Sequence, residues 1–171
     1  MKFKNFFAVA AITILAACGS PYRATDTAVV VPVDMQASFS SQYPGATNVV
    51  WSPYDANVVL PIDWELTGWS PLDNNDYVVR FNYQNDDYYA WYDKDGTWIG
   101  TAYVMKDYTN MPSAINTTLT SQFPGYNITS VNREFQKDKV AYEILLSNGT
   151  SKAKVLIDGN GNIIKSKTKI Q

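Results

Sequence analysis

The chain has 171 residues, of which 14 are basic and 16 acidic, so its formal net charge is −2. It contains no histidine and one cysteine. These counts exclude catalytic triads and metal sites that need an imidazole, and they exclude an internal disulfide bond.

The first 17 residues have the pattern of a secretory signal peptide. Two early lysines precede an apolar run at residues 6–17, which is too short to span a membrane. The sequence Leu-Ala-Ala-Cys-Gly at residues 15–19 resembles the processing site of bacterial lipoproteins. This resemblance implies that the chain is cut before Cys18 and that Cys18 carries the lipid. The alternative is an ordinary signal peptide with a chance cysteine.

The lipoprotein resemblance also predicts where the mature chain resides. More than one acyl chain on Cys18 would hold it stably on a membrane of the bacterial cell envelope. Gly19 stands where many inner-membrane lipoproteins have aspartate, which favours the outer membrane, with the domain facing the periplasm. Residues 18–33 are rich in Thr, Ala, Pro and Val and predict an extended tether.

A five-residue motif occurs twice, as Ser-Gln-Tyr-Pro-Gly at residues 41–45 and Ser-Gln-Phe-Pro-Gly at 121–125. Apolar residues four positions apart before each copy predict a short amphipathic helix, which the Pro-Gly pair ends. The repetition predicts two units, residues 34–108 and 109–171. The first unit has an insertion near residues 55–75, which resembles an elongated hairpin or flap.

Behind each predicted helix the sequence alternates as strands do. Residues 77–83 and 140–147 place aromatic or β-branched side chains at every second position. Asp-Gly or Asn-Gly pairs at 95–96, 148–149 and 158–159 supply hairpin turns. The predicted fold class is α+β, a tandem duplication of a helix plus about four antiparallel strands, with the helices packed on one face of an open sheet. Edge strands of the two units could pair into one continuous sheet.

These motifs together resemble the PepSY-like, β-lactamase-inhibitor-like lipoprotein domains. The features that carry the similarity are a short helix ending in Tyr/Phe-Pro-Gly, a Tyr-x-Val/Ile strand and a Val-x-Ile-Asp hairpin strand. The similarity covers about residues 34–169. It implies a tandem α+β fold and an envelope protein that binds or inhibits other proteins. That family has no catalytic signature, and its inhibitor contact loops match no stretch of this chain.

Candidate catalytic and metal-binding side chains are few. Carboxylate pairs occur at residues 63/65 and 86/87, but nothing in the sequence places two of them across a cleft, so we expect neither an enzyme nor a cofactor. Residues 93–96 and 158–162 resemble the start of a calcium loop. Both lack the glutamate needed at the twelfth position. Hairpin turns are therefore the favoured interpretation, with calcium binding as the alternative.

The two predicted units differ in charge and in aromatic content. All five tryptophans lie in the first unit, which has a net charge of −9 over residues 26–107, whereas the chain from residue 111 onward has +4. One sheet face would then present aromatic rings in the first unit and lysines in the second, which is a candidate docking surface. The alternative is that the rings pack beneath the flap as a second small core. The residues predicted to bind a partner are Arg80, Tyr89, Trp91, Trp64, Trp69, Lys152 and Lys154.

Two functions remain open from the sequence. The first is an envelope-anchored, non-enzymatic module that binds or inhibits a protein or peptide partner. The second is a surface lipoprotein that binds glycans through its Trp/Tyr-rich first unit, because exposed aromatic rings serve both kinds of partner. Nucleic acid is not an expected partner, since the lysines are few and the compartment contains little of it.

Overall fold

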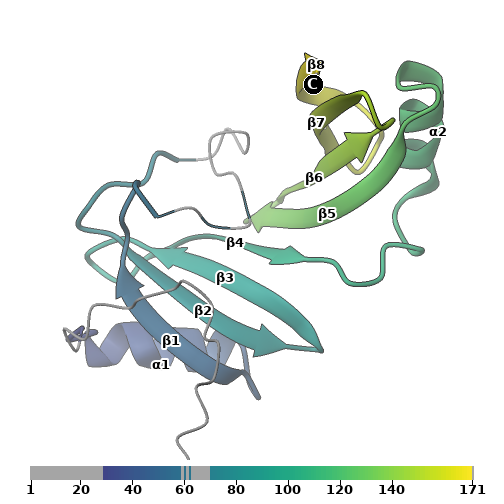
Figure 1. The fold of residues 1–171 in the computed structure, drawn as a ribbon. Coiled ribbons are helices and arrows are strands. Elements are labelled where there is room, and N and C mark those ends of the chain that lie inside the picture. Colours follow the sequence, from purple (N-terminus) through teal and green to yellow (C-terminus); the bar gives the residue numbers. More distant parts are fainter. Residues whose placement is uncertain (1–28, 59, 61, 63–69, 171) are drawn as a thin grey trace, which may run out of the picture.

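The computed structural model describes residues 29–58, 60, 62 and 70–170. The predicted signal peptide, Cys18 and most of the predicted tether lie outside these residues. The described chain forms ten elements (Figure 1). In chain order they are α1 (Val33–Gln42), β1 (Thr47–Pro53), β2 (Tyr77–Tyr83), β3 (Asp86–Tyr92), β4 (Trp98–Val104), α2 (Ser113–Gln122), β5 (Asn127–Gln136), β6 (Lys139–Ser147), β7 (Ser151–Asp158) and β8 (Ile163–Ile170).

All eight strands belong to one antiparallel sheet whose spatial order, β1 to β8, follows the chain. The expected fold class, a tandem duplication of helix-plus-strand units, is therefore wrong. β4 pairs with β5 through Thr101↔Phe135 to Val104↔Asn132, so the sheet continues where two units were expected to meet. This pairing gives hydrogen-bond partners to backbone groups that would otherwise lie at two open edges. The helices contribute only ten residues each.

Two buried apolar residues, one helical turn apart, attach each helix to the sheet. They are Met35 and Phe39 in α1, and Ile115 and Leu119 in α2. The Pro-Gly pair ends each helix, and its glycine has a φ of 86° after α1 and 79° after α2. Glycine adopts this left-handed conformation at little cost. The Pro-Gly pair in the sequence therefore accounts for where both helices end.

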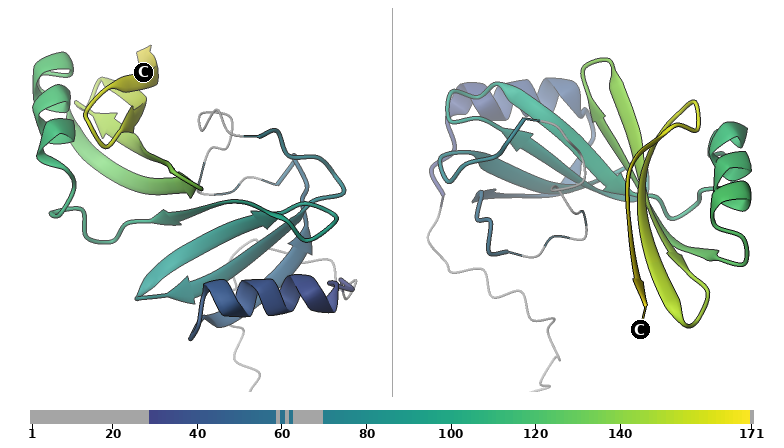
Figure 2. Two further views of the ribbon diagram at one scale, coloured as in Figure 1. Left: turned by 180° about the vertical axis from the view of Figure 1, so that it is seen from behind. Right: turned by 90° about the horizontal axis from the view of Figure 1, so that it is seen from above.

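The helices cover the same face of the sheet at its two ends (Figures 1 and 2). α1 lies over β2 and β3, and α2 lies over β5 to β7. The buried strand residues beneath α1 are Val79, Phe81, Tyr88, Ala90 and Tyr92. Those beneath α2 are Val131, Tyr142, Ile144, Leu146, Ala153, Val155 and Ile157. We call this side the helix face and the opposite side the second face.

A buried polar contact fixes the end of α1 to β4. The Tyr43 hydroxyl is hydrogen-bonded to the Thr101 hydroxyl, and Trp98 Nε1 donates to Thr101 Oγ1 at 2.9 Å. Burial raises the pKa of Tyr43 to about 12. Tyr43 thus packs as a core aromatic whose one polar atom has a partner.

The last residues of the predicted tether belong to the fold. Val31 is buried in the core beneath α1, and Val29 packs against that core. Gln36 Nε2 donates a hydrogen bond of 3.0 Å to the Val31 carbonyl oxygen. Any extended tether must therefore end before Val29.

Candidate functional site

The second face is defined by strand alternation, since residues directly opposite each other in paired strands point to the same side. Val79 and Phe81 point to the helix face, so Val78 and Arg80 point to the second face. The same alternation continues through β3 to β8. Its residues outside β1 include Val78, Arg80, Asn82, Asp87, Tyr89, Trp91, Ala102, Asn132, Glu134, Ala141, Glu143, Lys152, Lys154, Leu156, Lys165, Lys167 and Lys169.

Tyr89 and Trp91 are buried on this face. Tyr89 is 5% exposed and Trp91 is 0% exposed. They form a small core with Ile62, Val78 and Ala102, against which Tyr54, Leu60, Leu72 and Ile99 pack. The expectation that both rings lie on an open docking surface is therefore wrong. The structure agrees with the alternative, a second small core covered by residues of the predicted insertion.

The other predicted binding residues do not form one cluster. Arg80 is exposed on β2, directly opposite Val50 of the edge strand β1. Lys152 and Lys154 lie on β7, separated from β2 by four intervening strands. Trp64 and Trp69 lie outside the described residues. Of these described residues, Lys152 and Lys154 lie directly opposite further lysines, on β8.

Two carboxylates are buried where the second face passes from β5 to β6. Glu134 is 0% exposed and Glu143 is 1% exposed. Asn132 Nδ2 donates to Glu143 Oε1 at 3.3 Å, and Lys154 Nζ lies 3.7 Å from the same oxygen. Because a buried carboxylate is costly without such partners, these contacts hold Lys154 at the border of the second face. Neither glutamate was predicted to be buried, although Glu143 interrupts the mainly apolar strand β6.

Five lysines on β7 and β8 form the most uniform surface of the second face. Lys152 lies directly opposite Lys169, and Lys154 lies directly opposite Lys167. Lys165 continues the row opposite Leu156. All of them are exposed except Lys154, which is half-buried. We call Lys152, Lys154, Lys165, Lys167 and Lys169 the lysine patch.

Strands β7 and β8 carry few acids of their own, although Lys154 is paired with Glu143 of β6. Residues 151–170 contain five lysines and one acid, Asp158. Asp158 Oδ1 accepts the backbone N–H groups of Asn160 and Asn162 at 2.9 Å. The hydrogen bond from the Asn162 side chain, followed by these backbone hydrogen bonds, lowers the pKa of Asp158. Only Lys152 and Lys154 of this patch were predicted from the sequence, and the signal for the other three is the period-two run Lys-Ser-Lys-Thr-Lys at residues 165–169.

The sequence of this chain matches a known protein family. Residues 75–165, more than half of the chain, match the family described as "Putative beta-lactamase-inhibitor-like, PepSY-like". The chain belongs to this PepSY-like family. The resemblance predicted from the sequence motifs is thus confirmed, although the tandem architecture expected with it is not.

Solved structures with the same fold as this PepSY-like chain come from Bacteroides species. A DUF2874 family protein from Bacteroides uniformis is 21% identical, with a TM-score of 0.62 over 81% of this chain and 90% of that one. A BLIP-like protein from Bacteroides fragilis is 17% identical, with a TM-score of 0.62 over 85% and 92%. A Bacteroides eggerthii protein described as a "putative periplasmic" protein is 17% identical, with a TM-score of 0.63 over 82% and 90%. No curated protein matches the chain.

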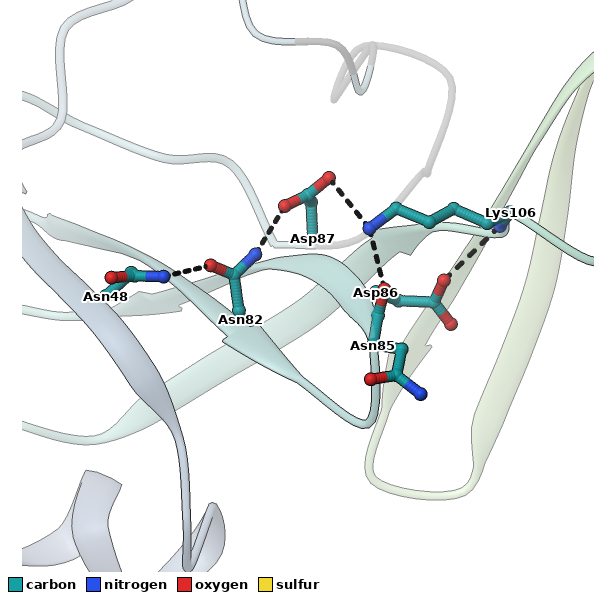
Figure 3. A network of polar contacts seen from close by, with 6 residues as sticks. All are labelled: Asn48, Asn82, Asn85, Asp86, Asp87 and Lys106. Atoms are coloured by element: carbon teal, nitrogen blue, oxygen red, sulfur yellow. Dashed lines mark hydrogen bonds and ion pairs between the residues drawn. The ribbon is translucent and has the colours of Figure 1, made fainter.

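The end of the second face near β1 of the PepSY-like chain carries a polar network (Figure 3). Asn48 Nδ2 donates to Asn82 Oδ1 at 2.7 Å, and Asn82 Nδ2 donates to Asp87 Oδ1 at 2.5 Å. Lys106 Nζ lies 3.5 Å from Asp87 Oδ2 and donates to the Asn85 carbonyl oxygen at 2.6 Å. These contacts link the side chains of β1, β2 and β3 to one another and link Lys106, which follows β4, to the β2–β3 turn. Asp87 is thus part of a structural network.

The aspartates of the suspected calcium loops serve the hairpin turns. Asp93 Oδ1 accepts the backbone N–H groups of Asp95 and Thr97 at 2.9 and 2.8 Å, as Asp158 does in the β7–β8 turn. Within the described residues, no three His, Cys, Asp or Glu side chains converge as a metal site. Nor does the described chain contain a helix long and apolar enough to cross a membrane. The geometry therefore favours the turn interpretation of both segments.

Proposed function

We propose that this PepSY-like chain is a non-enzymatic binding module of the bacterial cell envelope that binds an acidic protein partner through the lysine patch. This proposal rests on the β7–β8 register, which places Lys152 directly opposite Lys169 and Lys154 directly opposite Lys167. Like charges directly opposite each other destabilise a sheet. A partner that supplies carboxylates to this face would offset that repulsion.

Protection of a sheet edge explains only part of the patch. Lysines on an edge strand discourage unwanted pairing, and β8 is an edge of the sheet. Lys152 and Lys154, however, lie on β7, which has strands on both sides. All three lysines of β8 also point to the second face, whereas edge protection would work from either face. Binding of an anionic partner surface accounts for the lysines on the inner strand β7 and for the shared face of the three lysines on β8.

The family supports a protein partner in particular. Its description contains the words "beta-lactamase-inhibitor-like", and one structural relative is called BLIP-like, which suggests an inhibitor-like binding role. The glycan alternative has less support, because the described aromatic rings of the first half of the sheet pack into two cores. The fully buried rings Trp91 and Tyr92 cannot serve as stacking platforms for sugars.

Photo-crosslinking in cells tests the proposal. A photoreactive amino acid replaces Ser147, which lies directly opposite Lys152 on the second face. We expect a discrete adduct with an envelope protein, at least about tenfold reduced when Lys152→Glu and Lys169→Glu reverse the charge of two exposed lysines, because electrostatic complementarity is lost. The matched control places the same group at Thr120, which is exposed on α2. An adduct of equal yield at Thr120, or one unaffected by the charge reversal, would contradict the proposal.

A lipid anchor at Cys18 completes the proposed function. Cys18 is the one thiol of the chain and follows the apolar run at the position that lipoprotein processing requires. Cys18→Ala is expected to abolish incorporation of labelled palmitate and to leave the chain uncleaved or released from the membrane. Ser20→Ala, two residues later, should keep full labelling. Labelling of the Cys18 variant at the wild-type level would rule out the anchor.

A further inference from the structure

From the two edges of the sheet we infer that β8 accepts an extended acidic segment of the partner as a ninth strand, with an acidic residue at every second position. This inference rests on the proposed function and specifies how the lysine patch is used. It requires an available backbone edge and a matching side-chain period. The structure provides both.

The two edges differ in their ability to accept a strand. β1 has a register shift between Thr47 and Val50, a positive φ at Asn48 and a proline at its end. Bulges and prolines are the usual means of preventing strand addition. β8 has its register shift near its start, and it pairs regularly with β7 from Lys165 to Ile170. Among the described residues, β7 is the single strand neighbour of β8, so the far edge of this regular segment remains available.

The period of the lysines matches the period of a strand. Lys165, Lys167 and Lys169 alternate along β8, so neighbouring lysines are about 7 Å apart. A strand added to the far edge would run about 5 Å away, with directly opposite side chains on the same face. Acidic residues at alternate positions would then each meet one lysine. A segment with its acids in another arrangement would place some of them on the helix face.

The helix face of β8 determines which residues the added strand should have between its acids. Ser166 and Thr168 alternate with the lysines and lie opposite Val155 and Ala153, which belong to the core under α2. An added strand with threonine or other small neutral residues between its acids would match this small polar row. The inferred segment is therefore acidic on one side and neutral on the other.

Binding of synthetic peptides to the full-length protein in detergent micelles tests the inference. The probe is the labelled peptide Thr-Glu-Thr-Glu-Thr-Glu-Thr, and its affinity is measured by fluorescence anisotropy at low ionic strength. Two further peptides carry N-methyl groups, one on the glutamate amides and the other on the threonine amides. In a strand, successive N–H groups point to opposite edges, so only one of the two sets can donate to β8. We expect one methylated peptide to bind at least about tenfold more weakly and the other to bind within about twofold of the parent.

Lysine variants test the charged side of the same interface. Replacing Lys165, Lys167 and Lys169 with glutamine removes the positive charges but keeps polar side chains, and it should weaken binding at least about tenfold. The control replaces Lys137 and Lys139, two exposed lysines near the β5–β6 turn, with glutamine. Its affinity for the peptide should stay within about twofold of the wild-type value. Circular dichroism establishes that each variant is folded. The methylated peptides use the wild-type chain and do not depend on any variant folding.

The outcomes separate this inference from the function beneath it. Equal weakening, or equal binding, of the two methylated peptides would overturn strand addition, and sensitivity to the lysine variants would then leave a purely electrostatic acidic partner in place. If the parent peptide does not bind at all, strand addition is also overturned. The proposed function is then judged by the Ser147 crosslink alone.

Discussion

Replacing Trp91 with alanine is expected to lower the free energy of unfolding by about 3–5 kcal/mol, the range for buried aromatic side chains. Trp91 is 0% exposed at the centre of the second-face core. Val78 lies directly opposite it on β2 and Gly100 on β4, and the Tyr89 ring stacks 6.4 Å away. The glycine cannot extend into the cavity that alanine leaves. Urea denaturation followed by far-ultraviolet circular dichroism measures the change.

Arg80 provides the matched control for Trp91. It occupies the same face and the neighbouring strand, but its side chain is exposed. Arg80→Ala should change the free energy of unfolding by about 0.5 kcal/mol or less, as most surface substitutions do. If Trp91→Ala cost as little as Arg80→Ala, the second-face cluster would not be a core. The exposed docking surface first expected from the sequence would then have to be considered again.

The sequence predicted the local elements of this fold well. The i, i+4 apolar pairs and the Pro-Gly signals located both helices, and the alternation of residues 77–83 located β2. Hairpin turns also fell where Asn-Gly and Asp-Gly pairs predicted them. All of these depend on interactions between residues close together in the chain. Local propensity and period are sufficient to specify them.

The sequence did not predict features that depend on distant contacts. Pairing of β4 with β5 joins strands across the α2 segment, and the sequence offered it only as one possibility, because no local pattern distinguishes it from two separate units. Burial of Tyr89 and Trp91 depends on Leu60, Ile62 and Leu72, which come from the insertion. Alternation shows which side of a strand a ring occupies, but it does not show what covers that side. The lysine patch needed the β7–β8 register as well as the run of lysines on β8.

The β7–β8 turn gives a second case, because the sequence pointed to the wrong glycine. Asp158-Gly159 was the predicted turn pair, but the left-handed residue is Gly161, with a φ of 84°. A Cβ at Gly161 would lie 2.7 Å from the Ala114 carbonyl oxygen and 2.9 Å from Thr118 Oγ1, both on α2. Thr118 Oγ1 also donates to the Gly161 carbonyl oxygen at 2.8 Å. The turn is therefore packed directly against the helix.

Replacing Gly161 with alanine should consequently lower the free energy of unfolding by about 2–4 kcal/mol. The left-handed backbone contributes about 1–2 kcal/mol of this. The remainder comes from overpacking, because the helix carbonyl cannot move without shifting α2. Gly149 is the matched control, since it has a φ of 89° in the β6–β7 turn but no atom within 4 Å of its would-be Cβ. Gly149→Ala should therefore lower the free energy of unfolding only by the about 1–2 kcal/mol that the left-handed backbone costs. Urea denaturation of the two variants side by side measures the difference, and equal costs would show that contact between the turn and α2 contributes nothing to holding β7 and β8 in place.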